Sequence, residues 1–169
     1  MSSPPLGTIE LDPLLTAIAH VETSSGRNNW PRIERSYLPL GSRWTVQGHI
    51  IEGTGANVNE IVRERLQRWG MASAASWGPW QILYHTAADR GYTGPPSGLH
   101  EAEVSMTWVI RQLQLIMRRG ADTVSQIADA WNSGTHRDHI VPHHYMAQLV
   151  RAYDDYIVRA YDDYMRREK

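Results

Sequence analysis

The chain has 169 residues, with 17 Lys and Arg against 18 Asp and Glu, 7 Trp, 8 Tyr, no Phe and no Cys. This length predicts one domain with one core. The balanced charge excludes the basic surplus of a nucleic-acid-binding chain, and the lack of Cys excludes disulfides and thiolate metal sites. No apolar run approaches the ~20 residues of a membrane span, and the first seven residues lack the basic flank and apolar core of a secretory signal.

Apolar residues recur with helical spacing in most of the chain. The first helix is expected to begin at an Asp12 N-cap, with Pro13 in the first helical position, and to end near residue 24. A short hairpin is expected at 44–51, with Gly48 near its turn. Further helices are expected at about 58–69, 80–90, 100–119, 122–132 and from 143 to near the end, with connections at 73–79, 94–98 and 133–142.

The last helix contains an internal repeat. The segment VRAYDDY at 150–156 recurs at 158–164, a period of eight residues. Eight residues rotate a helix by about 800°, which leaves the second copy about 80° around the axis from the first. The repeat therefore does not encode a heptad seam. It is interpreted as a duplication that extends the helix, and the alternative is a helix that contacts a partner.

Glu22 is the first candidate for chemistry. It follows Leu15 and Ile18 on or next to the apolar stripe of the first helix, in its last turn. Loss of hydration and the negative end of the helix dipole both favour the protonated carboxylic acid there. A general acid must be protonated when it acts. The alternative is a Glu that extends into solvent at the helix end.

Three segments, in this order, resemble the lysozyme-like lytic transglycosylases and goose-type lysozymes. Residues 19–26 (AHVETSSG) are similar to the helix of that family that ends in a catalytic Glu and a small hydroxyl residue. Residues 75–91 (ASWGPWQILYHTAADRG) are similar to its Ser-x-Gly-x-x-Gln-Ile segment, followed by Thr-Ala and Gly. Residues 127–134 (IADAWNSG) are similar to its Ala-Tyr-Asn-x-Gly segment.

The resemblance implies that Glu22 is the acid/base that cleaves the β-1,4 bond between N-acetylmuramic acid and N-acetylglucosamine in peptidoglycan. It implies that Gly78 and Gln81 shape the sugar cleft and that Trp131 and Asn132 face it. Other residues of these segments expected to contact substrate are Thr23, Ser76, Trp77, Trp80 and Tyr84. No cofactor and no metal is expected.

The chain also departs from the family pattern. Thr23 stands where Ser is more usual, and Pro79-Trp80 replaces smaller or more flexible apolar residues. Trp131 replaces the usual Tyr, which removes a phenolic hydroxyl that could orient the acid or a sugar. Glu22 and Gln81 are 59 positions apart, more than in the simplest transglycosylases.

The number of carboxylates separates two mechanisms. A transglycosylase needs only Glu22, which protonates the bridging oxygen and then takes the proton of the muramic acid 6-hydroxyl to close a 1,6-anhydro ring. Hydrolysis with inversion needs a second carboxylate, ~6.5–9.5 Å from the first, to activate water. Glu34, flanked by Arg32 and Arg35, is the better candidate and Glu52 the other. The alternative for Glu34 is a plain ion pair with one of these arginines.

A histidine cluster is the remaining chemical feature. It comprises His136, His139, His143 and His144, and three imidazoles can bind zinc. Pro142 interrupts any helical face that would join them, and no His-Glu-x-x-His pattern is present. Loop hydrogen bonds, capping or contact with sugar are favoured over metal binding.

Together these features predict a mostly α (α+β), lysozyme-like helical domain with a small β-hairpin lobe and a central cleft. A single catalytic domain is expected over 1–169, with a flexible N-terminus at 1–11 and an extended C-terminal helix at 143–169. The expected protein is a monomeric phage lysin, held in the host cytoplasm until its release to the wall, or carried in the virion. The alternatives are a non-catalytic glycan binder and a structural virion protein whose terminal helix contacts a partner.

Overall fold

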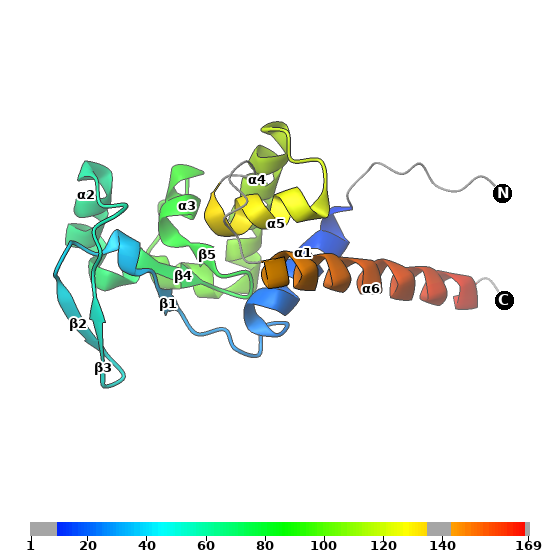
Figure 1. The fold of residues 1–169 in the computed structure, drawn as a ribbon, viewed down its shortest axis with the longest axis horizontal. Helices are drawn as coiled ribbons and strands as arrows, with labels where there is room; N and C mark the ends of the chain where they lie inside the picture. The colour runs from blue at the N-terminus through cyan, green and yellow to red at the C-terminus, as the bar shows by residue number, and fades with distance from the viewer. Residues whose placement is uncertain (1–9, 135–142, 168–169) are drawn as a thin grey trace. The chain divides into compact units, whose positions relative to one another are not determined.

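A computed structural model describes residues 10–134 and 143–167 of the chain. The chain divides into two compact units: a terminal unit of residues 1–28 and 111–169, and a central unit of residues 29–110. The described residues form six α-helices, short 3-10 helices and two small antiparallel sheets (Figure 1). The prediction of a mostly α chain with a minor β component is therefore confirmed, whereas a single catalytic domain over the whole chain stays a prediction.

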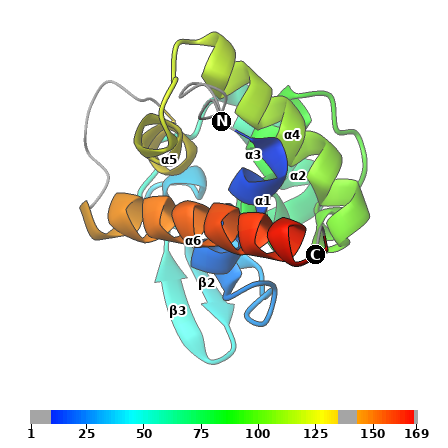
Figure 2. The same ribbon diagram turned by 90° about the vertical axis from the view of Figure 1, so that its right-hand side faces the viewer.

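The terminal unit is helical throughout its described part. It contains α1 (Leu11–Thr23), α5 (Val124–Ser133), α6 (His143–Arg167) and the second part of α4 (Ala102–Arg118). Helix α6 packs against both α1 and α5 (Figure 2). Their contacts bury Leu14, Ile18, Ile127 and Leu149 completely. Removal of this apolar surface from water is the main force that holds the three helices together.

Two helices of the terminal unit begin elsewhere than predicted. Helix α1 has Glu10 as its N-cap instead of Asp12, so Pro13 lies inside the first turn, where its missing N–H is tolerated. Helix α5 begins after Thr123 instead of Asp122, because the Thr123 hydroxyl accepts from the Gln126 amide while the Gln126 side chain accepts from the Thr123 amide. This reciprocal pair satisfies two backbone N–H groups, whereas a lone Asp cap satisfies one.

Helix α6 is continuous over both copies of the repeat, as expected for a duplication that extends a helix. In the first copy, the Tyr153 hydroxyl accepts from the Glu10 amide at 3.1 Å, which joins α6 to the start of α1. The second copy begins with Val158, whose side chain is 58% exposed. Within the terminal unit, α6 continues past the start of α1 (Figure 1).

The central unit contains the strands and most of the short elements. Its elements are β1 (Arg32–Ile33), η1 (Arg35–Tyr37), β2 (Arg43–Val46), β3 (His49–Glu52), α2 (Glu60–Trp69), η2 (Gly70–Ala74), β4 (Ala75–Trp77), β5 (Ile82–Leu83), α3 (Tyr84–Asp89), η3 (Pro96–His100) and the first part of α4. The predicted hairpin is confirmed, since β2 pairs with β3 and Val46 faces His49. Gln47 and Gly48 both have positive φ, which is the backbone of the turn preferred in two-residue hairpins.

The prediction failed at residues 73–90. The expected connection contains η2 and strand β4, and the expected helix at 80–90 is reduced to α3 because Ile82–Leu83 forms strand β5. Strand β4 pairs with β1 on one side and β5 on the other, so three short strands form a sheet. A short apolar run fits a helix or a strand equally well, and here Ile82–Leu83 pairs with β4, whose other edge is paired with β1.

A buried histidine joins three elements of the central unit. The His85 ring, on α3, is 3% exposed and stacks on Tyr37 of η1 with ring centroids 4.7 Å apart. Arg65 of α2 donates to His85 Nδ1 at 3.2 Å and to Asp89 Oδ1 at 2.8 Å. Burial lowers the pKa of His85 to about 4, and the positive charge of Arg65 acts in the same direction while Asp89 opposes it.

This histidine makes the stability of the protein depend on pH. Between about pH 6.5 and pH 4, His85 takes up a proton in the unfolded chain but not in the folded one, so acidification favours unfolding. We expect the free energy of unfolding to fall by about 3 kcal/mol over this range from His85 alone, and to be independent of His85 above about pH 7. Urea denaturation at a series of pH values measures this slope.

Two variants test the assignment. His85→Gln is expected to lose this part of the slope, whereas His49→Gln, which changes an exposed histidine on β3, is expected to keep it. Equal slopes in His85→Gln and the parent protein would contradict the role of His85.

Among the helices that the structure describes, none is long and apolar enough to cross a membrane.

Candidate active site

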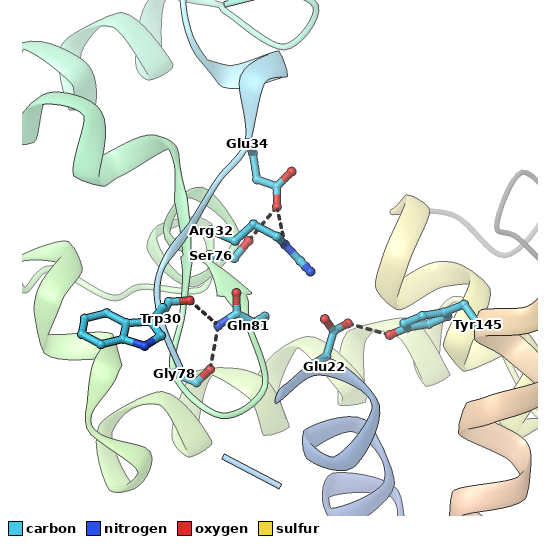
Figure 3. A network of polar contacts seen from close by, with 8 residues as sticks. All are labelled: Glu22, Trp30, Arg32, Glu34, Ser76, Gly78, Gln81 and Tyr145. Atoms are coloured by element: carbon cyan, nitrogen blue, oxygen red, sulfur yellow. Dashed lines mark hydrogen bonds and ion pairs between the residues drawn. The ribbon is translucent and has the colours of Figure 1, made fainter. Parts of the chain in front are cut away.

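Glu22 lies half-buried in the last turn of α1, in the terminal unit. The Tyr145 hydroxyl, on the first turns of α6, donates a hydrogen bond to Glu22 Oε1 at 2.7 Å (Figure 3). The packing of α6 on α1 brings the phenol and the carboxyl together although they are 123 positions apart in sequence. A hydrogen bond of this length holds the carboxyl group in one orientation, as a group that transfers a proton to a fixed atom requires.

Tyr145 was missed by the reasoning from sequence. The replacement of Tyr by Trp at position 131 indicated that a phenolic hydroxyl had been lost. The structure shows that a phenol is present at Glu22 nevertheless, contributed by another helix. Tyr145 directly follows His143 and His144, and the sequence analysis of this segment considered only its histidines. No local pattern in the sequence connects position 145 with position 22.

Three other predicted residues lie in the terminal unit. Trp131 is half-buried on α5, and Asn132 next to it is exposed. Thr23 is 1% exposed, and its hydroxyl donates to the Ala19 carbonyl and accepts from the Gly26 amide, both at 2.9 Å. The Thr23 hydroxyl therefore holds the turn that follows Glu22. This position favours a structural role for Thr23 over direct contact with a sugar.

Glu34 lies in the central unit, immediately after β1. Its Oε1 accepts from the Ser76 hydroxyl at 3.1 Å and from Arg32 Nε at 3.3 Å (Figure 3). The pairing of β1 with β4 explains this cluster, since Arg32 and Ser76 face each other in the register and the Glu34 amide donates to the Ala74 carbonyl. Glu34 thus makes the ion pair with Arg32 considered from the sequence, and its side chain keeps 36% exposure to solvent.

Gln81 ends the four-residue turn between β4 and β5. It has φ of +50°, which is rare for a residue with a side chain. The side chain is 7% exposed, and its Nε2 donates to the Trp30 carbonyl at 3.2 Å and to the Gly78 carbonyl at 3.1 Å (Figure 3). Gln81 therefore joins the start of its own turn to the segment that precedes β1, although the sequence also allowed an exposed helical residue at this position.

The remaining predicted residues of the central unit are mostly buried. Ser76, Trp80 and Tyr84 are exposed by 3%, 7% and 3%, so Trp80 and Tyr84 belong to the core. Trp77 is half-buried, and its indole N–H donates to the Ala72 carbonyl at 3.1 Å. These positions shape the three-stranded sheet that holds Glu34 and Gln81.

The candidate metal ligands fall partly outside the described residues. His136 and His139 lie in the segment 135–142, His143 has no described side chain, and His144 is exposed. Within the described residues, no group of three His, Cys, Asp or Glu side chains is arranged to hold a metal ion. The second alternative carboxylate, Glu52, is exposed on β3, and its carbonyl accepts from Arg35.

Comparison with known proteins gives no relative. The chain matches no protein-family model, no curated protein and no solved structure at a significant level. The site is therefore assigned from its own residues and geometry.

With Glu22 as the acid/base that the sequence resemblance implies, we expect Tyr145→Phe to lower the rate of glycan cleavage about 10-fold to 100-fold. The phenylalanine ring keeps the packing of α6 but removes a hydrogen bond to a carboxylate, a bond that contributes about 1.5–3 kcal/mol. The change should reduce kcat and leave KM nearly unchanged, because the hydroxyl is bound to Glu22. Initial rates of release of soluble fragments measure both constants. Tyr156→Phe, an exposed position on the same helix, is the control, and equal rates in both variants would contradict the role of Tyr145.

Proposed function

We propose that this chain cleaves the glycan strands of peptidoglycan between N-acetylmuramic acid and N-acetylglucosamine, with Glu22 as general acid and base. The observation that carries the proposal is the 2.7 Å hydrogen bond from Tyr145 to the Glu22 carboxyl. It supports a catalytic role because a half-buried carboxyl held in one orientation can pass a proton to a fixed bridging oxygen. The ordered resemblance of the three segments around Glu22, Gln81 and Trp131 supports the same substrate.

The proposed reaction is that of a lytic transglycosylase. Glu22 gives its proton to the bridging oxygen, and the bond from this oxygen to C1 of the muramic acid breaks. The carboxylate then takes the proton of the 6-hydroxyl, whose oxygen bonds to C1 and forms the 1,6-anhydro ring. Glu22 ends in its starting protonation state, and no water is consumed. Tyr145 orients the carboxyl through both steps.

The second candidate is an inverting muramidase, in which Glu34 activates water. The observation that favours it is the hydrogen bonding of Glu34 Oε1 by Arg32 and Ser76, because these two donors hold the carboxylate in one orientation. With 36% of its side chain exposed, the carboxylate is open to water. In this mechanism both Glu22 and Glu34 are required.

The products distinguish the two mechanisms. Purified peptidoglycan is digested, and the soluble fragments are analysed by mass spectrometry. Anhydro-muramyl ends, lighter by one water than reducing ends, support the transglycosylase. Reducing ends support the muramidase. Where both kinds of end are found, the variant Glu34→Gln decides between the two mechanisms. This variant should keep nearly full activity if the enzyme is a transglycosylase and lose it if the enzyme is a muramidase. Absence of fragments would refute both proposals.

The setting of the enzyme is part of the same proposal. We infer from the resemblance that the chain is a phage lysin that acts as a monomer on the bacterial wall, either as an endolysin or as part of the virion. The alternative of a virion protein that assembles through α6 is tested by size exclusion of a chain cut after Leu149. A change in oligomeric state would support the alternative, and an unchanged oligomeric state would argue against it.

A further inference from the structure

The central unit contains a polar pocket that the proposed reaction does not use. Its volume is about 430 Å³, which lies within the ~300–1,000 Å³ range of small-ligand sites. It is lined by residues of η1, the 56–59 loop, α2 and α3. The polar side chains of the lining are those of Tyr37, Asn57, Arg65, His85, Thr86 and Asp89, together with Asn59, whose Oδ1 accepts from the Val62 amide.

The charged groups of this pocket cancel one another. Arg65 and Asp89 form an ion pair at 2.8 Å. His85 is uncharged near neutral pH because burial lowers its pKa to about 4. Burial, followed by the charges of Asp89 and Glu34, raises the pKa of Tyr37, so its phenol stays protonated. A charged ligand would give up its hydration here without finding an uncompensated opposite charge, and this favours an uncharged ligand.

The same pocket offers several hydrogen-bonding groups. A guanidinium has no acceptor, so His85 Nδ1 must accept from Arg65, and the ring proton of neutral His85 is on Nε2. Nε2 is buried and has no hydrogen-bond partner among the described residues, and the groups open to a ligand are those of Asp89, Asn57 and Thr86. The Asp89 carboxylate is 54% exposed and can accept further hydrogen bonds, and Asn57 and Thr86 can both donate and accept. An uncharged ligand with several hydroxyl or amide groups fits this set.

We propose that this pocket binds an uncharged sugar unit through its hydroxyl and acetamido groups. The choice of sugar rests on the function proposed above. Of the two sugars in peptidoglycan, N-acetylglucosamine bears only hydroxyl and acetamido groups, whereas N-acetylmuramic acid also bears a lactyl group, which is a carboxylate in the free sugar and carries the stem peptide in the polymer. The pocket therefore selects N-acetylglucosamine. Its lining does not include Tyr145, Arg32 or Ser76, whose side chains hydrogen-bond to the Glu22 and Glu34 carboxyl groups.

Nuclear magnetic resonance titration of the full chain tests this proposal. The probe is the methyl glycoside of N-acetylglucosamine, and N-acetylmuramic acid is the charged comparison. All variants carry Glu22→Gln, so that turnover does not complicate the titration. We expect shifts of the amide signals of residues 57 and 86 and of the Arg65 side chain with the neutral sugar. The charged sugar should bind at least about tenfold more weakly at this site.

Two pocket variants and two matched controls complete the design. Asn57→Ala and Thr86→Val should each weaken binding at this site about tenfold, the loss expected for about 1.4 kcal/mol of hydrogen bonding. Asn28→Ala and Thr54→Val, at exposed positions outside the pocket lining, should leave it unchanged. Equal binding in all four variants, equal binding of the charged sugar, or no shifts at these residues at millimolar concentrations would each overturn the proposal. Fragment release from peptidoglycan tests the proposed function separately. The sugar-binding proposal and the proposed function can therefore each fail while the other holds.

Discussion

Glu22→Gln is expected to abolish the release of soluble fragments from peptidoglycan, with a loss of about 10²–10⁴-fold in rate. Glutamine has the shape of glutamic acid, and its amide oxygen can still accept the hydrogen bond from Tyr145. It cannot give a proton to the bridging oxygen or take one from the 6-hydroxyl. The defect should therefore appear in the chemical step and not in folding.

The measurement compares turbidity loss and fragment release by the parent protein and the variant at equal concentration. Glu64→Gln, on the exposed face of α2, is the matched control and should keep full activity. Circular dichroism and co-sedimentation with peptidoglycan check folding and binding. Retention of more than about half of the parent activity in Glu22→Gln would remove Glu22 from the mechanism. A parent protein that sediments with the wall but releases nothing would instead indicate a glycan-binding protein.

Gly78→Ala is expected to destabilise the central unit by about 3 kcal/mol. Gly78 has φ of +74°, which costs an alanine about 1–2 kcal/mol. A Cβ at this position would also lie 2.5 Å from the Leu99 carbonyl oxygen and 3.0 Å from Ser105 Oγ. Backbone atoms cannot move aside as the end of a flexible side chain can, so the overlap adds about 1–3 kcal/mol.

Gly48→Ala separates these two contributions. Gly48 has φ of +80°, but a Cβ there would meet nothing within 4 Å. It should therefore show the cost of the positive φ alone, about 1–2 kcal/mol. Urea denaturation gives the free energies of both variants, and equal losses would show that the space around Gly78 is not restrictive.

The sequence predicted much of the local structure of this chain. The alternating residues around Gly48 indicated the β2–β3 hairpin, since a two-residue turn with positive φ suits Gly there. Apolar spacing indicated α1, α2, α4, α5 and α6, with ends that differ by a few residues. The short apolar run after Trp80 was misread as a helix, because such a run fits a helix or a strand equally well, whereas Ile82–Leu83 pairs with β4.

In the candidate site, too, some residues were identified from the sequence and their contacts were not. Glu22 and Glu34 were proposed from their residue types and neighbours and Gln81 from the resemblance, and they remain the candidates for chemistry and positioning. Their partners were not identified: the Tyr145 hydroxyl on Glu22, the Ser76 hydroxyl on Glu34 and the Trp30 carbonyl on Gln81. These contacts join positions 123, 42 and 51 residues apart.

The sequence by itself determined most of the helices and the place where the hairpin turns, because these features depend on residues a few positions apart. Only the tertiary structure decided that Tyr145 orients Glu22 and that His85 is buried beneath Tyr37 beside Arg65. The physical reason is that such contacts require two elements to pack with a particular register and rotation. That packing is set by the burial of many apolar side chains at once, and no short stretch of sequence contains it.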